Sequence, residues 1–246
     1  MNVDLIHLRS LWQQAFGDPV EAIEDFFETG FSPDRFCCIL ENGIPVSALY
    51  WFDCTLDGQK IAYLYAIATE KSHQGQGLCR RLMTKTHEIL RNQGYAGAVL
   101  VPANAELFPL YEKLGYRYAA TVREFTCKAA ESAATITRID ARQYENLRAR
   151  YLPAGSVLQT GATLDFYATY GQFYAGDDFL LACAVQDGVL YAQEILGNTA
   201  LCGQILRALG AEEGSFRAPG DEKPFAMYYP LQENCPAPKY LGFALD

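Results

Sequence analysis

Several features that would point to familiar classes of protein are scarce or missing in this chain of 246 residues. It contains three histidines, and its eight cysteines form no C-x-x-C pair, so the sequence predicts no metal site and mostly buried, reduced thiols. No apolar run is long enough to span a membrane, and the first residues lack the basic and apolar regions of a signal peptide. We therefore expect a soluble, cytoplasmic protein with no membrane partner.

Basic residues are also in short supply. Lysine and arginine number 20 against 29 acidic residues, which gives a formal net charge of -9. Nucleic-acid binding depends on clustered Lys and Arg that neutralise phosphates, so no nucleic-acid partner is predicted. An acidic protein attracts cations over about 8 Å, the Debye length at physiological salt, and this favours a cationic small-molecule or peptide partner. The oligomeric state is unknown from the sequence.

A glycine loop joins a predicted strand, residues 63–68, to a predicted helix, residues 80–93. Gly75 and Gly77 would let the main chain approach an anion, the helix N-terminus offers unpaired N–H donors, and Arg80 adds positive charge. The dinucleotide fingerprint G-x-G-x-x-G would need a glycine at Arg80, and G-x-x-x-x-G-K-[ST] occurs nowhere, so nicotinamide and ATP ligands are disfavoured. From these residues alone, a phosphate site and an ordinary turn with a solvated basic face are equally good interpretations.

A second motif follows the loop. An apolar strand, residues 97–101, precedes a predicted helix, residues 105–114, which carries Tyr111 seven positions after Asn104. Together with Ala66-Ile67-Ala68 and the loop from Gln74 to Arg80, the segment Asn-x6-Tyr-Glu-Lys-Leu-Gly-Tyr resembles the GNAT superfamily of acyl-CoA-dependent N-acyltransferases. Two motifs in the right order and at the right separation are far more specific than either alone.

The resemblance implies an α+β fold in which helices flank a mixed, mostly antiparallel twisted sheet. It also implies that acetyl-CoA is the cosubstrate and that an acetyl group passes to a primary amine of a small molecule or peptide by direct attack. Tyr111 matches the tyrosine that protonates the departing CoA thiolate, with a half-buried helix aromatic as the alternative. Asn104 matches a cofactor-contacting asparagine, with a helix N-cap as the alternative. The other cofactor-binding residues that the resemblance implies are Ala66, Ile67, Ala68, Gln74, Gly75, Gln76, Gly77, Leu78, Cys79 and Arg80.

The sequence departs from the family where relatives often place a glutamate base, because Tyr65 and Val99 occupy those positions. A protonated amine cannot attack a thioester, so its proton needs an acceptor. The alternatives are Glu70, a water relay and the carboxylate of Asp246. The last follows a resemblance to the multi-domain aminoglycoside acetyltransferases associated with enhanced intracellular survival, which bring their C-terminal carboxylate into the first domain's active site. Otherwise the terminus completes the sheet of the second domain, and a chain without a base would be a catalytically weak acyl-CoA-binding or regulatory protein.

Composition divides the chain into two predicted domains, residues 1–128 and 135–246, separated by a linker of small residues. The first is the acetyl-CoA-binding domain, in which Asn42-Gly43 and Asp57-Gly58 join successive strands as tight hairpin turns. The second repeats the order of elements without a phosphate loop. We interpret it as a smaller, degenerate GNAT-like domain that packs against the first and walls the acceptor site. Within it, residues 163–174 are predicted to be helical and residues 240–245 to form a strand.

Overall fold

A computed structural model describes residues 4–245 of the chain. The elements of the first half are α1 (Leu5–Phe16), α2 (Val20–Asp25), β1 (Phe36–Glu41), β2 (Ile44–Leu56), β3 (Gln59–Thr69), α3 (Leu78–Asn92), β4 (Gly97–Leu100), α4 (Phe108–Lys113) and β5 (Arg117–Lys128). Those of the second half are β6 (Thr137–Ile139), α5 (Ala141–Tyr151), β7 (Leu158–Gln159), α6 (Ala162–Tyr167), β8 (Gln172–Ala175), β9 (Phe179–Gln186), β10 (Val189–Gly197), α7 (Cys202–Leu209), β11 (Glu213–Pro219) and β12 (Lys223–Pro230). None of the helices within this range is long and apolar enough to cross a membrane.

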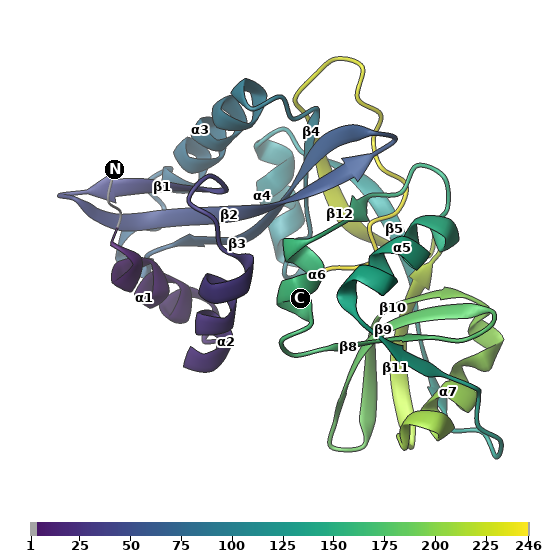
Figure 1. Cartoon of the computed structure of the whole chain (residues 1–246). Coiled ribbons are helices and arrows are strands. Elements are labelled where there is room, and N and C mark those ends of the chain that lie inside the picture. Colours follow the sequence, from purple (N-terminus) through teal and green to yellow (C-terminus); the bar gives the residue numbers. More distant parts are fainter. Residues whose placement is uncertain (1–3, 246) are drawn as a thin grey trace.

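One continuous sheet runs through the molecule (Figure 1). Its strand order is β1-β2-β3-β4-β12-β5-β11-β10-β9-β8-β6, and β7 pairs with β2 off this path. Among the described strands, the pairs β3/β4 and β10/β11 are parallel and the others antiparallel. Asn42 and Asp57 have φ angles of 52° and 49°, as the predicted two-residue hairpin turns require. The α+β class with a mixed, mostly antiparallel sheet is confirmed.

Helices cover both faces of the sheet. Helices α1 and α2 lie on one face of β1, β2 and β3, and α3 lies on the other, in the upper left of Figure 1. Helices α5 and α6 lie between this part and the lower strands β8 to β11, against which α7 packs. One buried cluster extends from Leu8 and Phe26 in the first half to Tyr144 and Phe243 in the second. The two halves therefore share a hydrophobic core.

Strand β12 ties the two halves together. It comes from the C-terminal part of the chain, yet it lies between β4 and β5, with Tyr228 opposite Val99 and Met227 opposite Tyr118. Strand β5 pairs with β12 near its start and with β11 over its remainder. The sheet is therefore continuous across the two predicted domains, and their boundaries at residues 128 and 135 stay a prediction.

Two predicted elements are wrong. The helix predicted at residues 163–174 ends at Tyr167, and residues 172–175 form β8, because Phe173 pairs with Ala182 of β9 and packs in the shared core. Tertiary pairing here outweighs the helical spacing of the aromatic residues. The strand predicted at residues 240–245 is absent from that segment, where Tyr240 makes one isolated bridge with Ser156 and Gly242 turns the chain with a φ angle of 59°. The carbonyl groups of Leu241, Gly242 and Phe243 accept hydrogen bonds from the side chains of other segments.

Candidate active site

Strands β3 and β4 part near the middle of β3. Their parallel pairing runs from Ile61 to Tyr63 of β3, and β4 then ends at Leu100 while β3 continues to Thr69. Beyond Tyr63, the edge of β3 that faces β4 has no strand partner among residues 4–245. Buried main-chain N–H and C=O groups need partners, so this edge is suited to pairing with an extended ligand.

A β-bulge lies in the part of β3 that extends beyond β4. Pairing with β2 shifts register between Tyr65 and Ala68, so that Ala66 and Ile67 together face Leu49. Ala66 has a φ angle of 49°, a conformation that costs a residue with a side chain about 1–2 kcal/mol and that recurs at functional sites. The three predicted pantetheine-binding residues, Ala66, Ile67 and Ala68, therefore lie where the strand is most irregular and most open.

A cavity of about 450 Å³ lies at this edge of β3. Its walls come from α1, α2, the bulged part of β3, the end of β4, α4 and the region of α6, together with the C-terminal segment. The lining residues are Trp12, Phe16, Asp18, Ala22, Tyr63, Leu64, Tyr65, Ala66, Ile67, Leu100, Val101, Ala103, Leu107, Tyr111, Phe166, Tyr170 and Leu245. Segments that are distant in the sequence thus meet where β3 and β4 separate.

The glycine loop lies at the N-terminus of α3, as the sequence predicts. Gly75 and Gly77 have φ angles of 74° and 76°, and a Cβ at either position would meet no atom within 4 Å. The first bond of the helical ladder runs from the Arg81 N–H to the Gly77 carbonyl, so the N–H groups of residues 78–80 precede that ladder. Such an open and electropositive helix start is the arrangement that binds phosphate groups.

Side chains of the loop fix its shape. Gln74 Nε2 donates to the Thr69 carbonyl at 3.1 Å, and Gln76 Nε2 donates to the Ser72 carbonyl at 3.3 Å. The exposed side chain of Arg80 donates a hydrogen bond from Nη1 to the main-chain carbonyl of Lys113, the last residue of α4, at 3.4 Å. Leu78 is buried beneath the loop. Burial also raises the pKa of the neighbouring Cys79 thiol, which therefore stays protonated and is a poor nucleophile.

Tyr111 of α4 lines the cavity, and it packs in the buried cluster of α3 rather than in the cluster of α1 and α2. Its ring is 7% exposed and stands edge-on to Tyr116 at a centroid distance of 5.9 Å. Burial raises the pKa of the Tyr111 hydroxyl well above its ordinary value, and Cys79 raises it further. The phenol is therefore fully protonated at neutral pH and can act as a proton donor.

Asn104 lies outside this cavity. Its side-chain oxygen accepts a hydrogen bond from the Glu106 N–H at 3.0 Å and caps a short 3-10 turn that precedes α4. It lines a neighbouring cavity together with Phe108 and Tyr118. The N-cap alternative is confirmed, and the cofactor contact of Asn104 stays a prediction.

An aromatic wall forms the opposite side of the cavity, and sequence reasoning largely missed it. The rings of Phe16, Trp12, Tyr65, Phe166 and Tyr170 follow one another with centroid distances of 5.9, 5.5, 6.2 and 5.6 Å. Two of the five, Phe166 and Tyr170, come from the second half of the chain, which therefore contributes to the cavity. The sequence signal was the i, i+4 spacing of Trp12 and Phe16 and of Phe166 and Tyr170, which equally describes core residues.

The candidate positions for a general base lie at different places relative to the cavity. Val99 is fully buried in the sheet, whereas Tyr65 lines the cavity. Glu70 lies 2.9 Å from the His73 ring and is not part of the cavity lining. The N–H of Leu245 donates to the Tyr63 hydroxyl at 3.2 Å, so the chain reaches the cavity at that residue. Asp246 lies outside the described residues, and the role of its carboxylate stays a prediction.

A buried ion pair holds the C-terminal segment, residues 240–245, in place. Arg148 donates to Glu194 from Nε at 2.6 Å and from Nη2 at 3.0 Å, and neither side chain has exposed area. The same guanidinium donates to the Leu241 carbonyl at 3.2 Å. Burial alone would lower the pKa of Arg148, but the Glu194 carboxylate raises it, so the guanidinium stays charged. Gln159 donates a hydrogen bond to the carbonyl of Phe243, two residues further along the chain. These bonds direct Leu245 to the cavity.

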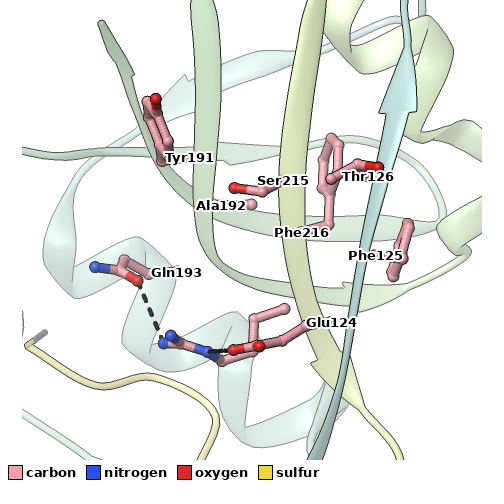
Figure 2. Close-up of a pocket in the computed structure, with 9 residues that line it drawn as sticks. Glu124, Phe125, Thr126, Tyr191, Ala192, Gln193, Ser215 and Phe216 are labelled. Carbon is pink, nitrogen blue, oxygen red and sulfur yellow. Dashed lines mark hydrogen bonds and ion pairs between the residues drawn. The ribbon is translucent and has the colours of Figure 1, made fainter. Parts of the chain in front are cut away.

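The second half repeats the parting of two parallel strands. Strand β10 pairs with β11 up to Ala192, and a register shift follows before Glu194, the residue that binds Arg148. A cavity of about 660 Å³ lies over β5, β10 and β11. Figure 2 shows its lining residues, with Gln193 and Glu124 at one end. Arg217 donates to both of these side chains at 3.3 Å. The loop after β10 has no pair of glycines, and the absence of a phosphate site from the second half stays a prediction.

Comparison with known proteins agrees with this geometry. The family model of the acetyltransferase (GNAT) domain matches residues 3–119, which include the bulged strand, the glycine loop and Tyr111. Residues 3–119 therefore have the sequence of a GNAT acetyltransferase domain. No curated protein matches the sequence.

Solved structures extend the likeness in fold over both halves of this chain. A GCN5-related N-acetyltransferase from Anabaena variabilis has a TM-score of 0.74 at 12% identity, covering 94% of this chain and 71% of its own. A GCN5-related N-acetyltransferase from Kribbella flavida has a TM-score of 0.69 at 17% identity, covering 92% and 69%. A tandem GNAT protein from the clavulanic acid biosynthesis pathway has a TM-score of 0.55 at 9% identity, covering 95% and 97%.

Proposed function

We propose that this protein transfers an acetyl group from acetyl-CoA to a primary amine by direct attack. The observation that carries the proposal is the cavity at the parting of β3 and β4, which lies between an unpaired strand edge, Tyr111 and an aromatic wall. The glycine loop follows β3 after one short turn, so a single extended ligand can lie along both. The match of residues 3–119 to the GNAT acetyltransferase domain supports acyl transfer as the reaction class.

The residues of the site fit the chemical groups of acetyl-CoA. The open edge of Ala66, Ile67 and Ala68 would pair with the pantetheine amides, and a main-chain N–H there would polarise the thioester carbonyl. The N–H groups of residues 78–80 would hold the pyrophosphate, with the exposed side chain of Arg80 beside it. Acetyl-CoA supplies the activated acyl carbon.

The proton balance assigns roles to the protein. Attack forms the bond between the amine nitrogen and the acyl carbon and breaks the bond between that carbon and sulfur. Tyr111 donates its proton to the leaving sulfur and regains one from solvent. The protons lost by the amine pass to water, so one net proton is released for each ammonium consumed. No carboxylate at residues 65 or 99 takes this proton, because tyrosine and valine stand there.

The experiment is an acetyl-transfer assay with purified protein, acetyl-CoA and a panel of primary amines. Release of free CoA thiol and an amine product heavier by one acetyl group, identified by mass spectrometry, are expected. CoA release without an acetylated product would indicate hydrolysis. Tight binding of acetyl-CoA without turnover of any amine would instead favour the second candidate, a catalytically weak acyl-CoA-binding or regulatory protein. The absence of glutamate at residues 65 and 99 also favours this second candidate.

A further inference from the structure

Helix α3 concentrates positive charge in an acidic chain. The formal net charge of the whole protein is -9. The helix itself has one acidic side chain, Glu88, and four basic ones, Arg80, Arg81, Lys85 and Arg91. Of these basic residues, the proposed pyrophosphate site at the helix start uses Arg80 alone. The positive charge farther along α3 therefore has no part in the function proposed above.

A small cavity lies on one face of this helix, and we call it the α3 pocket. Its volume is about 110 Å³, and its lining residues are Arg80, Met83, Thr84, His87, Arg91, Leu114 and Tyr229. Cavities that hold a whole small-molecule ligand usually measure about 300–1,000 Å³, so the α3 pocket has room for one small group. The ring of Tyr229, from β12, stacks on His87 at a centroid distance of 4.0 Å. The second half of the chain thus completes a pocket on a helix of the first.

Two arginine side chains line opposite ends of the α3 pocket. Arg80 and Arg91 are exposed and lie about 16 Å apart along the helix. Arg80 Nη1 donates to the Lys113 carbonyl and Arg91 Nη2 to the Tyr229 hydroxyl, both at 3.4 Å. Within residues 4–245, neither guanidinium forms an ion pair with a carboxylate. Each therefore keeps further N–H donors for a ligand in the pocket.

The floor of the α3 pocket is polar and uncharged. His87 is 5% exposed, and its Nε2 lies 2.8 Å from the Tyr116 hydroxyl. Burial, and then the charge of Arg91, lower the pKa of His87 to about 4, so the imidazole is neutral at pH 7. Thr84, which is exposed, adds a hydroxyl to the lining. The described lining thus combines two positive side chains with neutral donors, which is the chemistry that binds an oxyanion.

We propose that the α3 pocket binds a phosphate monoester. Guanidinium groups pair with phosphate oxygens through parallel N–H bonds, and the hydroxyl groups of Thr84 and Tyr229 supply further donors. Two sources carry such a group: the 3′-phosphate of CoA and a free phosphate in solution. The first source rests on the proposed function, and it is favoured because Arg80 belongs both to the pocket and to the proposed pyrophosphate site. The second source is independent of that function.

Binding measurements on the full chain identify the source. Isothermal titration calorimetry would compare acetyl-CoA with 3′-dephospho-acetyl-CoA, and a phosphorus NMR titration would follow inorganic phosphate. For the 3′-phosphate, we expect acetyl-CoA to bind roughly tenfold more tightly than its dephospho form, the effect of one charge-assisted hydrogen bond. For a free phosphate, we expect equal affinities of the two cofactors and binding of inorganic phosphate that Arg91→Gln weakens roughly tenfold. Equal cofactor affinities without such phosphate binding would overturn the proposal.

A pair of matched variants locates the phosphate group. Arg91→Gln should weaken acetyl-CoA binding roughly tenfold and leave the dephospho form unchanged, so that the two cofactors bind alike. Arg81 is exposed on the same helix and lies outside the pocket lining, so Arg81→Gln is the control and should leave the difference between the cofactors intact. Arg91→Lys keeps the charge and should restore part of the difference. If Arg91 only stabilises the end of α3, Arg91→Gln will lower the melting temperature and leave the cofactor difference unchanged, which would contradict the placement.

The same measurements separate this inference from the proposed function. Tighter binding of acetyl-CoA than of its dephospho form, with no acetyl transfer to any amine, would leave the inference standing and reject the proposed function. If acetyl-CoA does not bind at all, the proposed function is rejected and the titration with inorganic phosphate decides on the pocket. An affinity for inorganic phosphate that is the same with and without Arg91→Gln would then overturn the inference.

Discussion

The glycine loop allows a sharp test of cofactor binding, because Gly77 can be replaced without filling occupied space. A Cβ at this position would meet no atom within 4 Å, although the φ angle of 76° strains any residue with a side chain. Asparagine and aspartate tolerate this conformation about equally well, and they differ by one negative charge. We therefore compare Gly77→Asp with Gly77→Asn, so that strain cancels and charge remains.

The expected difference follows from the helix start that the loop forms. A phosphate held by the N–H groups of residues 78–80 would lie within about 6 Å of a carboxylate at residue 77, and at an effective dielectric constant of about 20 each pair of negative charges costs about 3 kcal/mol. That energy corresponds to a dissociation constant for acetyl-CoA roughly 100-fold weaker for Gly77→Asp than for Gly77→Asn. Isothermal titration calorimetry measures both, after circular dichroism has shown that the variants melt alike.

Equal affinities of the two variants for acetyl-CoA would refute the reasoning, since the charge would then lie far from any phosphate. Salt offers an internal check. The difference between the variants should shrink as ionic strength rises, because the loop is exposed and its charges are screened.

Other predictions address catalysis and stability. Tyr111→Phe keeps the ring and removes the proton donor, so kcat should fall roughly 100-fold with little change in KM for acetyl-CoA, and a near-normal kcat would reduce Tyr111 to a packing residue. Burial and then the charge of Arg91 lower the pKa of His87 from 6.5 to about 4, so only the unfolded state gains this proton as pH falls from 6.5 to 4. Stability should therefore be complete above pH 6.5 and lose about 2 kcal/mol by pH 5, and urea unfolding of His87→Gln should show a flatter pH profile. An unchanged profile would mean that other groups cause the loss. Arg148→Met leaves Glu194 buried without its counter-charge and should destabilise the fold by about 3–5 kcal/mol, whereas the double variant Arg148→Met/Glu194→Gln should recover much of this; urea midpoints no better for the double variant would contradict the pairing.

Features with short-range causes were predictable from the sequence. The positive φ angles at Asn42 and Asp57 follow from Asn-Gly and Asp-Gly pairs, which specify tight turns by themselves. The glycine loop lies at the start of α3 because glycines between an apolar strand and a helical pattern allow few other conformations. Tyr111 lies in the cavity because it is tied to the same local motif.

Features that depend on contacts between distant segments were not predictable. The sequence of β12 reads as an ordinary strand, and nothing in it indicates insertion between β4 and β5. Phe166 and Tyr170 have the spacing of core residues, and they line the cavity only because α6 packs against the first half. The C-terminal segment alternates like a strand, but the side chains of Arg148 and Gln159 bond its carbonyl groups instead.

A crystal structure of the protein with acetyl-CoA tests the central claim most directly. The account predicts the pyrophosphate on the N–H groups of residues 78–80, the pantetheine arm along the open edge of Ala66 to Ala68, and the sulfur facing the Tyr111 hydroxyl within hydrogen-bond reach. The acetyl group would then point towards the aromatic wall. Acetyl-CoA bound in the second half, or bound with its sulfur away from Tyr111, would contradict the account.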